Sequence, residues 1–139
     1  MAEHVSHSEA DTEAIGAAFA WRLSVGAVVL LDGPLGAGKT AFVRGMARGL
    51  DAHPGDVSSP TFTLLQEYAG MITLYHADLY RLTPREVEEL GLLDVSAEGI
   101  LAVEWPERWT SPPKDAIRVT IAKIDDETRA INMGGHGGP

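Results

Sequence analysis

A glycine-rich loop between an apolar run and an amphipathic segment is the feature that most constrains how this chain folds. Residues 33–40 read Gly-Pro-Leu-Gly-Ala-Gly-Lys-Thr, a complete G-x-x-x-x-G-K-[ST] phosphate-binding motif. The apolar run 27–31 precedes the motif, and residues 40–50 place apolar side chains at the spacing of one buried helix face. Strand, loop and helix therefore come in the order that a nucleoside triphosphate site needs.

Each residue type in the motif has a physical role. Glycines let consecutive backbone N–H groups close around phosphate oxygens, and the N-terminus of the following helix favours the same anion. Lys39 is expected to reach the β and γ oxygens as a catalytic cation, and the Thr40 hydroxyl is expected to ligate Mg²⁺. The expected nucleotide-binding residues of the loop are Gly33, Leu35, Gly36, Ala37, Gly38, Lys39, Thr40 and Ala41.

Length and composition indicate one domain. The 139 residues are enough for one hydrophobic core, and 45% of them are hydrophobic. We expect a P-loop domain over residues 1–133 and a disordered glycine-rich tail over 134–139, since the tail has nothing to bury. The absence of cysteine excludes disulfides, thiolate metal sites and cysteine catalysis.

The sequence favours a cytoplasmic protein that contacts neither membrane nor nucleic acid by itself. No apolar run reaches the length of a membrane span, and residues 3–7 are mostly polar where a signal peptide would be apolar. The net charge of −9 argues against autonomous RNA binding, because surfaces that capture RNA are normally basic. Solubility alone accounts for such a charge, and an acidic chain still serves a nucleic-acid pathway where partner proteins hold the substrate.

The remaining pattern predicts an α/β fold: a single-domain P-loop NTPase with a mixed, mostly parallel central sheet flanked by helices. Ser8, with Asp11 three residues later, predicts one helix start, and the run 83–86 (Thr-Pro-Arg-Glu) predicts another. The β-prone segments 61–68 and 71–77 predict an antiparallel hairpin inside an otherwise parallel sheet. Further strands are expected over 100–103, 117–121 and 128–133, with the first helix ending near residue 26 and the later one including 90–93.

Two acids stand where a P-loop protein needs them to complete its site. Glu104 ends the apolar run 100–103, and Asp78 follows the strand predicted over 71–77. Ligands of open α/β sheets lie beyond the carboxyl ends of strands, so we interpret both acids as catalytic and Glu104 also as a metal ligand. An acid in either position alone is more often solvated or helix-capping, but the shared placement of the two acids favours the site.

Aromatic and histidine residues near these acids leave alternatives open. Trp105 either senses the nucleotide or packs at a strand end, as aromatic residues more often do. His76 is either a group that supports the site or an ordinary polar strand residue. His4 and His7 lie on a polar N-terminal arm, and we interpret them as solvated rather than as a zinc site.

Five motifs in order carry a family resemblance. They are residues 34–40, 59–63 (Ser-Pro-Thr-Phe-Thr), 76–81 (His-Ala-Asp-Leu-Tyr-Arg), 89–92 (Glu-Leu-Gly-Leu) and 103–107 (Val-Glu-Trp-Pro-Glu). Over residues 12–129 the chain resembles the TsaE family, also called YjeE, which are P-loop ATPases of bacterial threonylcarbamoyladenosine tRNA modification. The chain departs from the family pattern at Pro34, where members commonly carry an acid, and in its short, glycine-rich C-terminus.

The resemblance implies ATP and Mg²⁺ as cofactors and gives roles to particular residues. By this likeness Thr40 and Glu104 would hold Mg²⁺, and Asp78 would help to order the catalytic water. Residues 59–63 would form a nucleotide-sensitive switch that includes Thr61. The resemblance also implies that Glu9 or Thr12 would lie near the nucleotide and that Arg129 would reach it from the late strands. Together with Trp105, these residues complete the expected nucleotide-binding set.

The same resemblance implies a function and its partners. The family is required for modification of adenosine 37 in tRNAs that read codons starting with A, and it works with the TsaB and TsaD proteins. TsaD transfers the threonylcarbamoyl group, so a TsaE protein would hydrolyse ATP to reset the complex and would meet tRNA only through it.

Two other functions stay open on the residues alone. One is a small-molecule P-loop kinase, although 139 residues leave little room for a lid and an acceptor site. The other is a nucleotide-dependent interaction module without significant catalysis. A GTPase is not favoured, because the chain has no Asn-Lys-x-Asp guanine-reading motif.

Overall fold

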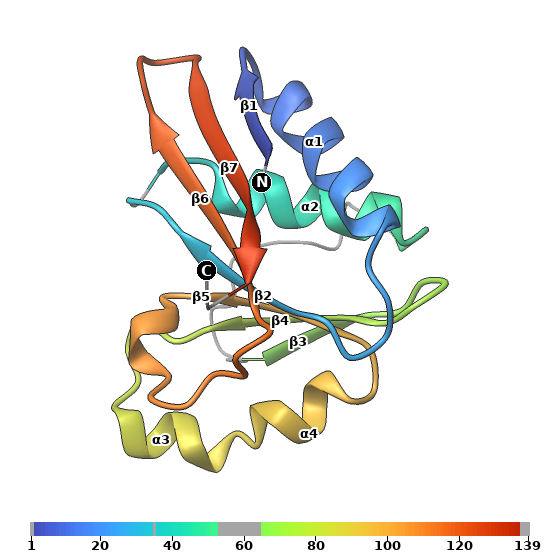
Figure 1. Cartoon of the computed structure of the whole chain (residues 1–139), viewed down its shortest axis with the longest axis vertical. Helices are drawn as coiled ribbons and strands as arrows, with labels where there is room; N and C mark the ends of the chain where they lie inside the picture. Colours follow the sequence, from blue (N-terminus) through green and yellow to red (C-terminus); the bar gives the residue numbers. More distant parts are fainter. Residues whose placement is uncertain (1, 35, 53–64, 137–139) are drawn as a thin grey trace.

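A seven-stranded sheet forms the centre of the protein (Figure 1). A computed structural model describes residues 2–34, 36–52 and 65–136. Across these residues, no helix has the length and apolar character needed to cross a bilayer. The elements are β1 (Ala2–Ser6), α1 (Glu9–Trp21), β2 (Val28–Asp32), α2 (Lys39–Gly49), β3 (Leu65–Tyr68), β4 (Leu74–Asp78), α3 (Pro84–Glu89), α4 (Leu92–Ser96), β5 (Ile100–Glu104), a short 3-10 helix η2 (Pro106–Arg108), β6 (Ile117–Lys123) and β7 (Arg129–His136).

The sheet is mixed, as predicted, but less parallel than predicted. Its strand order is β1-β7-β6-β2-β5-β4-β3. The central strands β6, β2, β5 and β4 pair in parallel, whereas β1 with β7, β7 with β6 and β3 with β4 pair antiparallel. The expectation of a mostly parallel sheet was wrong because β1 adds an antiparallel pairing that the sequence did not reveal. The hairpin β3–β4 and the late pair β6–β7 are confirmed within the described residues.

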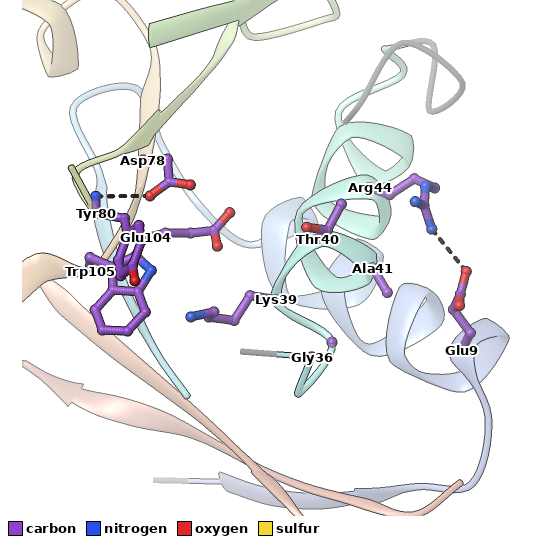
Figure 2. Close-up of a pocket in the computed structure, with 11 residues that line it drawn as sticks. Glu9, Gly36, Lys39, Thr40, Ala41, Arg44, Asp78, Tyr80, Glu104 and Trp105 are labelled. Atoms are coloured by element: carbon purple, nitrogen blue, oxygen red, sulfur yellow. Dashed lines mark hydrogen bonds and ion pairs between the residues drawn. The ribbon is translucent and has the colours of Figure 1, made fainter. Parts of the chain in front are cut away.

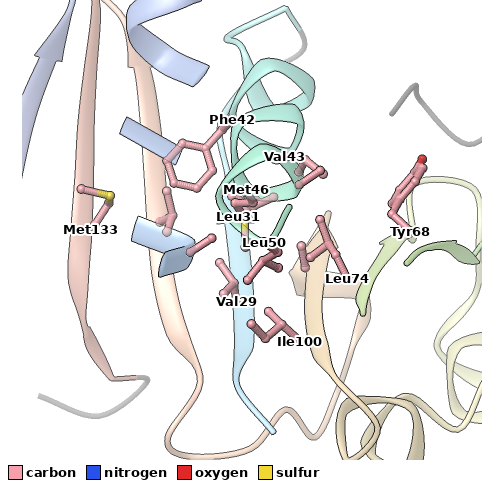
Figure 3. Packing of buried hydrophobic residues seen from close by; sticks show 14 of the residues in the cluster. Val29, Leu31, Phe42, Val43, Met46, Leu50, Tyr68, Leu74, Ile100 and Met133 are labelled. Atoms are coloured by element: carbon pink, nitrogen blue, oxygen red, sulfur yellow. The ribbon is translucent and has the colours of Figure 1, made fainter. Parts of the chain in front are cut away.

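Helices cover both faces of the sheet, α1 and α2 on one side and α3 and α4 on the other (Figure 1). Side chains of β2 alternate between the faces, so Val29 and Leu31 pack with α1 and α2, while Val28 and Leu30 pack with the opposite layer. Figure 3 shows the first cluster, in which apolar side chains of α2 lie over β2. Burial on both faces explains the continuous apolar run 27–31.

The predicted helix starts are confirmed, whereas two helix ends differ. Ser8 caps α1 through its side chain, and Thr83 begins α3 with a capping box. The later helix, predicted to include 90–93, is two helices instead. Gly91 between them takes the left-handed conformation (φ 64°), which breaks the helix at little steric cost. The first helix ends at Trp21 rather than near residue 26.

The described segments near both termini join the sheet, although a polar arm and a disordered tail were expected there. The N-terminal arm forms β1, in which Val5 pairs with Ala130 of β7. Strand β7 continues to His136, so residues 134–136 of the tail expected to be disordered lie in a strand beside β6. Backbone pairing holds these segments, and it needs no apolar side chain that composition would reveal. Residues 137–139 lie outside the described residues.

Candidate nucleotide-binding site

The glycine-rich loop joins the carboxyl end of β2 to the N-terminus of α2. Gly36 and Gly38 both have φ in the left-handed region (81° and 108°), where a side chain would be strained. Gly38 is the N-cap of α2, so the first free N–H groups of the helix face the space in front of the loop. The motif therefore has the local geometry that anion binding needs, with Leu35 outside the described residues.

Lys39 is held at this loop by a backbone carbonyl oxygen and an aromatic ring. Its Nζ donates a hydrogen bond to the Gly33 carbonyl oxygen (2.7 Å) and lies 4.7 Å from the centroid of the Trp105 ring. A carbonyl dipole and an aromatic face both attract a cation without neutralising it. The buried Lys39 side chain is thus placed beside the loop, where an incoming anion would meet it.

Two carboxyl groups face the loop from neighbouring parallel strands. Asp78 of β4 pairs directly with Glu104 of β5, and their strands end at the same edge of the sheet. Figure 2 shows both side chains pointing toward α2, where Thr40 follows Lys39 in the first turn of the helix. Glu104 is almost fully buried, with 5% of its surface exposed. The strand-end reasoning thus brings Asp78, Glu104, Lys39 and Thr40 into one place, as the sequence indicated.

His76 contacts Glu104 directly, and this answers the question that the sequence left open. It precedes Asp78 by two residues on β4, so the two side chains share a face of the sheet. Its ring Nε2 lies 2.6 Å from Glu104 Oε2, and the imidazole has no exposed surface. His76 therefore contacts Glu104 at the pocket and is not an isolated polar strand residue.

The surroundings of Asp78 change its acidity. Burial raises the pKa of Asp78 above its ordinary value, a hydrogen bond from the Tyr80 N–H (3.0 Å) opposes that rise, and the nearby charge of Glu104 adds to it. A carboxylate whose pKa is raised is a stronger base than an exposed one. Asp78 is therefore better suited than a surface acid to accept a proton.

Sequence reasoning missed two residues that line the same pocket, Tyr80 and Arg44. The rings of Tyr80 and Trp105 pack in a tilted arrangement with centroids 4.8 Å apart. Trp105 has the left-handed backbone (φ 59°) that is uncommon for a large residue. Arg44 lies one helical turn after Thr40 and pairs with Glu9 (3.1 Å). Tyr80 stood inside the motif 76–81, whereas nothing in the sequence distinguished Arg44 from any helix-surface arginine.

Two adjoining pockets, each of about 280 Å³, receive most of the predicted site residues. Both are lined by Glu9, Gly36, Gly38 and Ala41. The first adds residues of α2 and the carboxyl edge of the sheet: Lys39, Thr40, Arg44, Asp78, Tyr80, Glu104 and Trp105. The second adds residues from the start of α1 and the β6–β7 connection: His7, Ser8, Thr12, Asp126, Glu127 and Arg129.

Two residues that line the second pocket, Arg129 and Thr12, hold neighbouring segments of the chain together. Arg129 donates from Nε to the Ala37 carbonyl oxygen (2.8 Å), so a residue of β7 holds the loop. The Thr12 hydroxyl hydrogen-bonds the Ser6 hydroxyl (2.7 Å), which ties α1 to β1. Thr61 and the segment 59–63 lie outside the described residues.

The donor set fits Mg²⁺ better than a metal held by protein alone. The described residues contain no group of three or more His, Asp or Glu side chains placed to bind a metal ion. Mg²⁺ is usually held by one or two protein oxygens together with substrate phosphates and water. Thr40 and Glu104, which line the same pocket, supply oxygen ligands of that kind.

Fold and site together define an α/β protein with a phosphate-binding-loop sequence at the carboxyl edge of a mixed sheet. The family model described as "Threonylcarbamoyl adenosine biosynthesis protein TsaE" matches residues 6–131. The chain belongs to the TsaE family, and the family resemblance read from the motifs is confirmed.

Individual relatives agree with the family match. A TsaE protein of Nostoc sp. is 44% identical over 118 residues, which cover 80% of this chain and 72% of the relative. One from Treponema pallidum is 39% identical over 136 residues, covering 93% and 97%. Both are named tRNA threonylcarbamoyladenosine biosynthesis protein TsaE. The crystal structure of Bacillus subtilis YdiB superposes with a TM-score of 0.75 at 31% identity, covering 95% of this chain and 83% of YdiB.

Proposed function

We propose that this chain is the ATP-binding and ATP-hydrolysing subunit required for threonylcarbamoyl modification of adenosine 37 in tRNAs that read A-starting codons. It would act in the cytoplasm on the TsaB and TsaD complex to sustain turnover, without transferring the group itself. The observation that carries the proposal is the meeting of Lys39, Asp78 and Glu104 at the loop of a TsaE family member.

The two pockets divide the nucleotide between them. The phosphates lie against the loop in the first pocket, where the N-terminus of α2 and Lys39 offset their charge. The base and sugar enter the second pocket, beside Glu9, Thr12 and Arg129. Glu9 lines both pockets, which supports a contact between Glu9 and the part of the nucleotide where phosphate and sugar join.

The residues around the γ-phosphate position have separate roles. The Thr40 hydroxyl and the Glu104 carboxylate would hold Mg²⁺, which would supply positive charge to the phosphates. Asp78, with its raised pKa, orients the attacking water and takes up its proton. Lys39 stabilises the charge that develops on the transferred phosphoryl oxygens.

The test is Mg²⁺-dependent ATP hydrolysis by the chain alone and with the TsaB and TsaD pair of the same organism. Lys39→Ala is expected to lose about three decades of turnover, since a unit charge at 4 Å is worth about 4 kcal/mol at an effective dielectric near 20. Lys114→Ala is the matched control, because this exposed lysine precedes β6 at the opposite edge of the sheet, and it should retain full turnover.

Each outcome distinguishes one function from another. Strong stimulation by TsaB and TsaD supports a partner-gated ATPase of tRNA modification. Robust turnover that ignores the pair would favour a small-molecule kinase instead, and nucleotide binding without hydrolysis in any mixture would favour an interaction module. Normal ATP hydrolysis by Lys39→Ala would contradict the assignment of residues 33–40 as the phosphate-binding loop.

A further inference from the structure

His76 is a buried polar side chain for which the proposed reaction has so far no use. Its ring is fully buried, and among the described residues its Nδ1 has no hydrogen-bond partner. Buried polar atoms in proteins are nearly always hydrogen-bonded, so an unsatisfied nitrogen is a cost to folding. A hydrophobic residue at this position, in the apolar layer beneath α2, would stabilise the fold more than histidine does. The hydrogen bond between His76 and Glu104 is therefore the feature that explains the histidine.

The register of the sheet gives that bond its direction. His76 pairs with Ala102 on β5, and Glu104 lies two residues further along the same strand and on the same face. The imidazole therefore reaches diagonally past the small methyl group of Ala102 to the carboxyl group. A shorter side chain at position 76 would leave Glu104 without this neighbour.

The chemistry of the two groups decides which one donates. A carboxylate that ligates a metal has only acceptor atoms, so Nε2 must carry the hydrogen of the 2.6 Å bond to Glu104 Oε2. The bond fixes one oxygen of Glu104 and leaves the other for a metal in the pocket beside Thr40. A glutamate without such a partner must lose the freedom of three torsions each time the metal binds.

We propose that His76 is a positioning residue that holds the Glu104 carboxylate ready to ligate Mg²⁺. The inference rests on the proposed function, because it requires Glu104 to be a metal ligand. Hydrogen-bond partners of metal ligands are typically worth about 10- to 100-fold in metal affinity or activity. Because His76 acts through Glu104, substitution of His76 is expected to leave metal-free nucleotide binding unchanged.

Two substitutions of similar polarity separate the donor from mere packing. The amide nitrogen of His76→Gln can take a position near that of Nε2 and still donate to Glu104. The amide of His76→Asn is one carbon shorter and corresponds to Nδ1, so it leaves Glu104 without a donor. His4→Asn on β1 is the matched control, since His4 is exposed and lines neither pocket.

Binding of Mn²⁺ to the protein–ADP complex, followed by electron paramagnetic resonance, measures the metal site without catalysis. Mn²⁺ suits the same oxygen ligands as Mg²⁺. His76→Asn should weaken Mn²⁺ binding by about 10-fold or more, His76→Gln should recover most of that loss, and His4→Asn should match the wild type. ADP affinity in EDTA should agree among all four proteins, and ATP turnover should fall in kcat rather than in KM.

The outcomes separate this inference from the proposed function. Mn²⁺ binding by His76→Asn that equals the wild type overturns the role of His76 and leaves the ATPase proposal intact. Equal losses of Mn²⁺ affinity in His76→Asn and His76→Gln, or weaker ADP binding in EDTA, overturn the positioning role of His76 in favour of a packing role. Thermal melts confirm that each variant folds. A wild-type chain that binds neither ADP nor Mn²⁺ overturns both proposals together.

Discussion

Asp78 carries its charge in an unfavourable place, and that has a consequence for stability. Burial and the neighbouring Glu104 charge both raise its pKa in the folded protein. The neutral amide of Asp78→Asn can still accept the Tyr80 N–H and has no charge to desolvate. We expect Asp78→Asn to lose ATP turnover and to have a higher Tm than the wild type at pH 7, without nucleotide or metal.

The pH dependence of that gain follows from the direction of the shift. Because the pKa is higher in the folded than in the unfolded state, the wild type loses stability as Asp78 ionises with rising pH. The advantage of Asp78→Asn is therefore complete above the folded pKa and vanishes below the unfolded value near 3.8. Thermal melts from pH 3 to 8, with exposed Asp115→Asn as control, measure it. A gain that persisted at pH 3 would contradict this explanation.

The position of some site residues was predictable from the sequence, whereas the position of others was not. Asp78 and Glu104 were predictable as a pair, since acids that follow buried strands meet at one edge of a parallel sheet. The His76–Glu104 bond was not, because it depends on the register between β4 and β5 and on a side-chain direction. Arg44 was missed for a similar reason: its place in the pocket depends on where α1 brings Glu9.

At the scale of elements, the packing of α1 on α2 holds the loop helix in place. A Cβ atom at Gly45 of α2 would lie 2.0 Å from the Glu13 carbonyl oxygen of α1, so the two backbones touch at a position where only glycine fits. Arg44 and Arg48 flank this contact and both pair with Glu13. The approach of the two helices is thus set by a missing side chain as much as by apolar contacts.

Gly45→Ala tests this contact against ordinary helix propensity. Within a helix, alanine is favoured over glycine by about 1 kcal/mol, so propensity alone predicts a more stable protein. The clash with the α1 backbone predicts the opposite, a loss of about 1–3 kcal/mol in the free energy of unfolding. Urea unfolding measures it, and Ala14→Gly on the exposed face of α1 reports the propensity term alone. A rise in stability for Gly45→Ala would contradict the close approach.

Elements were predictable where side chains determine them and not where backbone pairing does. The cap at Ser8 and the capping box at Thr83 are local signals, and both helices begin where these residues indicated. Strand β1 has few apolar side chains and exists through its pairing with β7, so its five residues looked like a polar arm. The extension of β7 to His136 has the same origin.

At the scale of the whole molecule, charge decides what the chain can bind without help. Eleven basic residues stand against 20 acidic ones. Several of the cations are already engaged: Arg44, Arg48 and Arg118 pair with carboxylates, while Lys39 and Arg129 bond to backbone carbonyls at the loop. The described residues therefore offer little positive charge to the phosphates of a nucleic acid, which is consistent with the proposal that partner proteins hold the tRNA.

We accordingly expect the chain alone to bind tRNA more weakly than about 10⁻⁴ M at physiological salt, the weak end of non-specific binding by nucleic-acid-binding proteins. Lowering the salt should not rescue binding, because an acidic surface releases few counterions from the tRNA and is repelled more strongly when screening falls. Fluorescence anisotropy of labelled tRNA at 50 and 150 mM salt, with and without TsaB and TsaD, measures both effects. Micromolar binding by the chain alone that weakened steeply with salt would mean that a basic surface exists despite the net charge, and that the chain contacts tRNA directly.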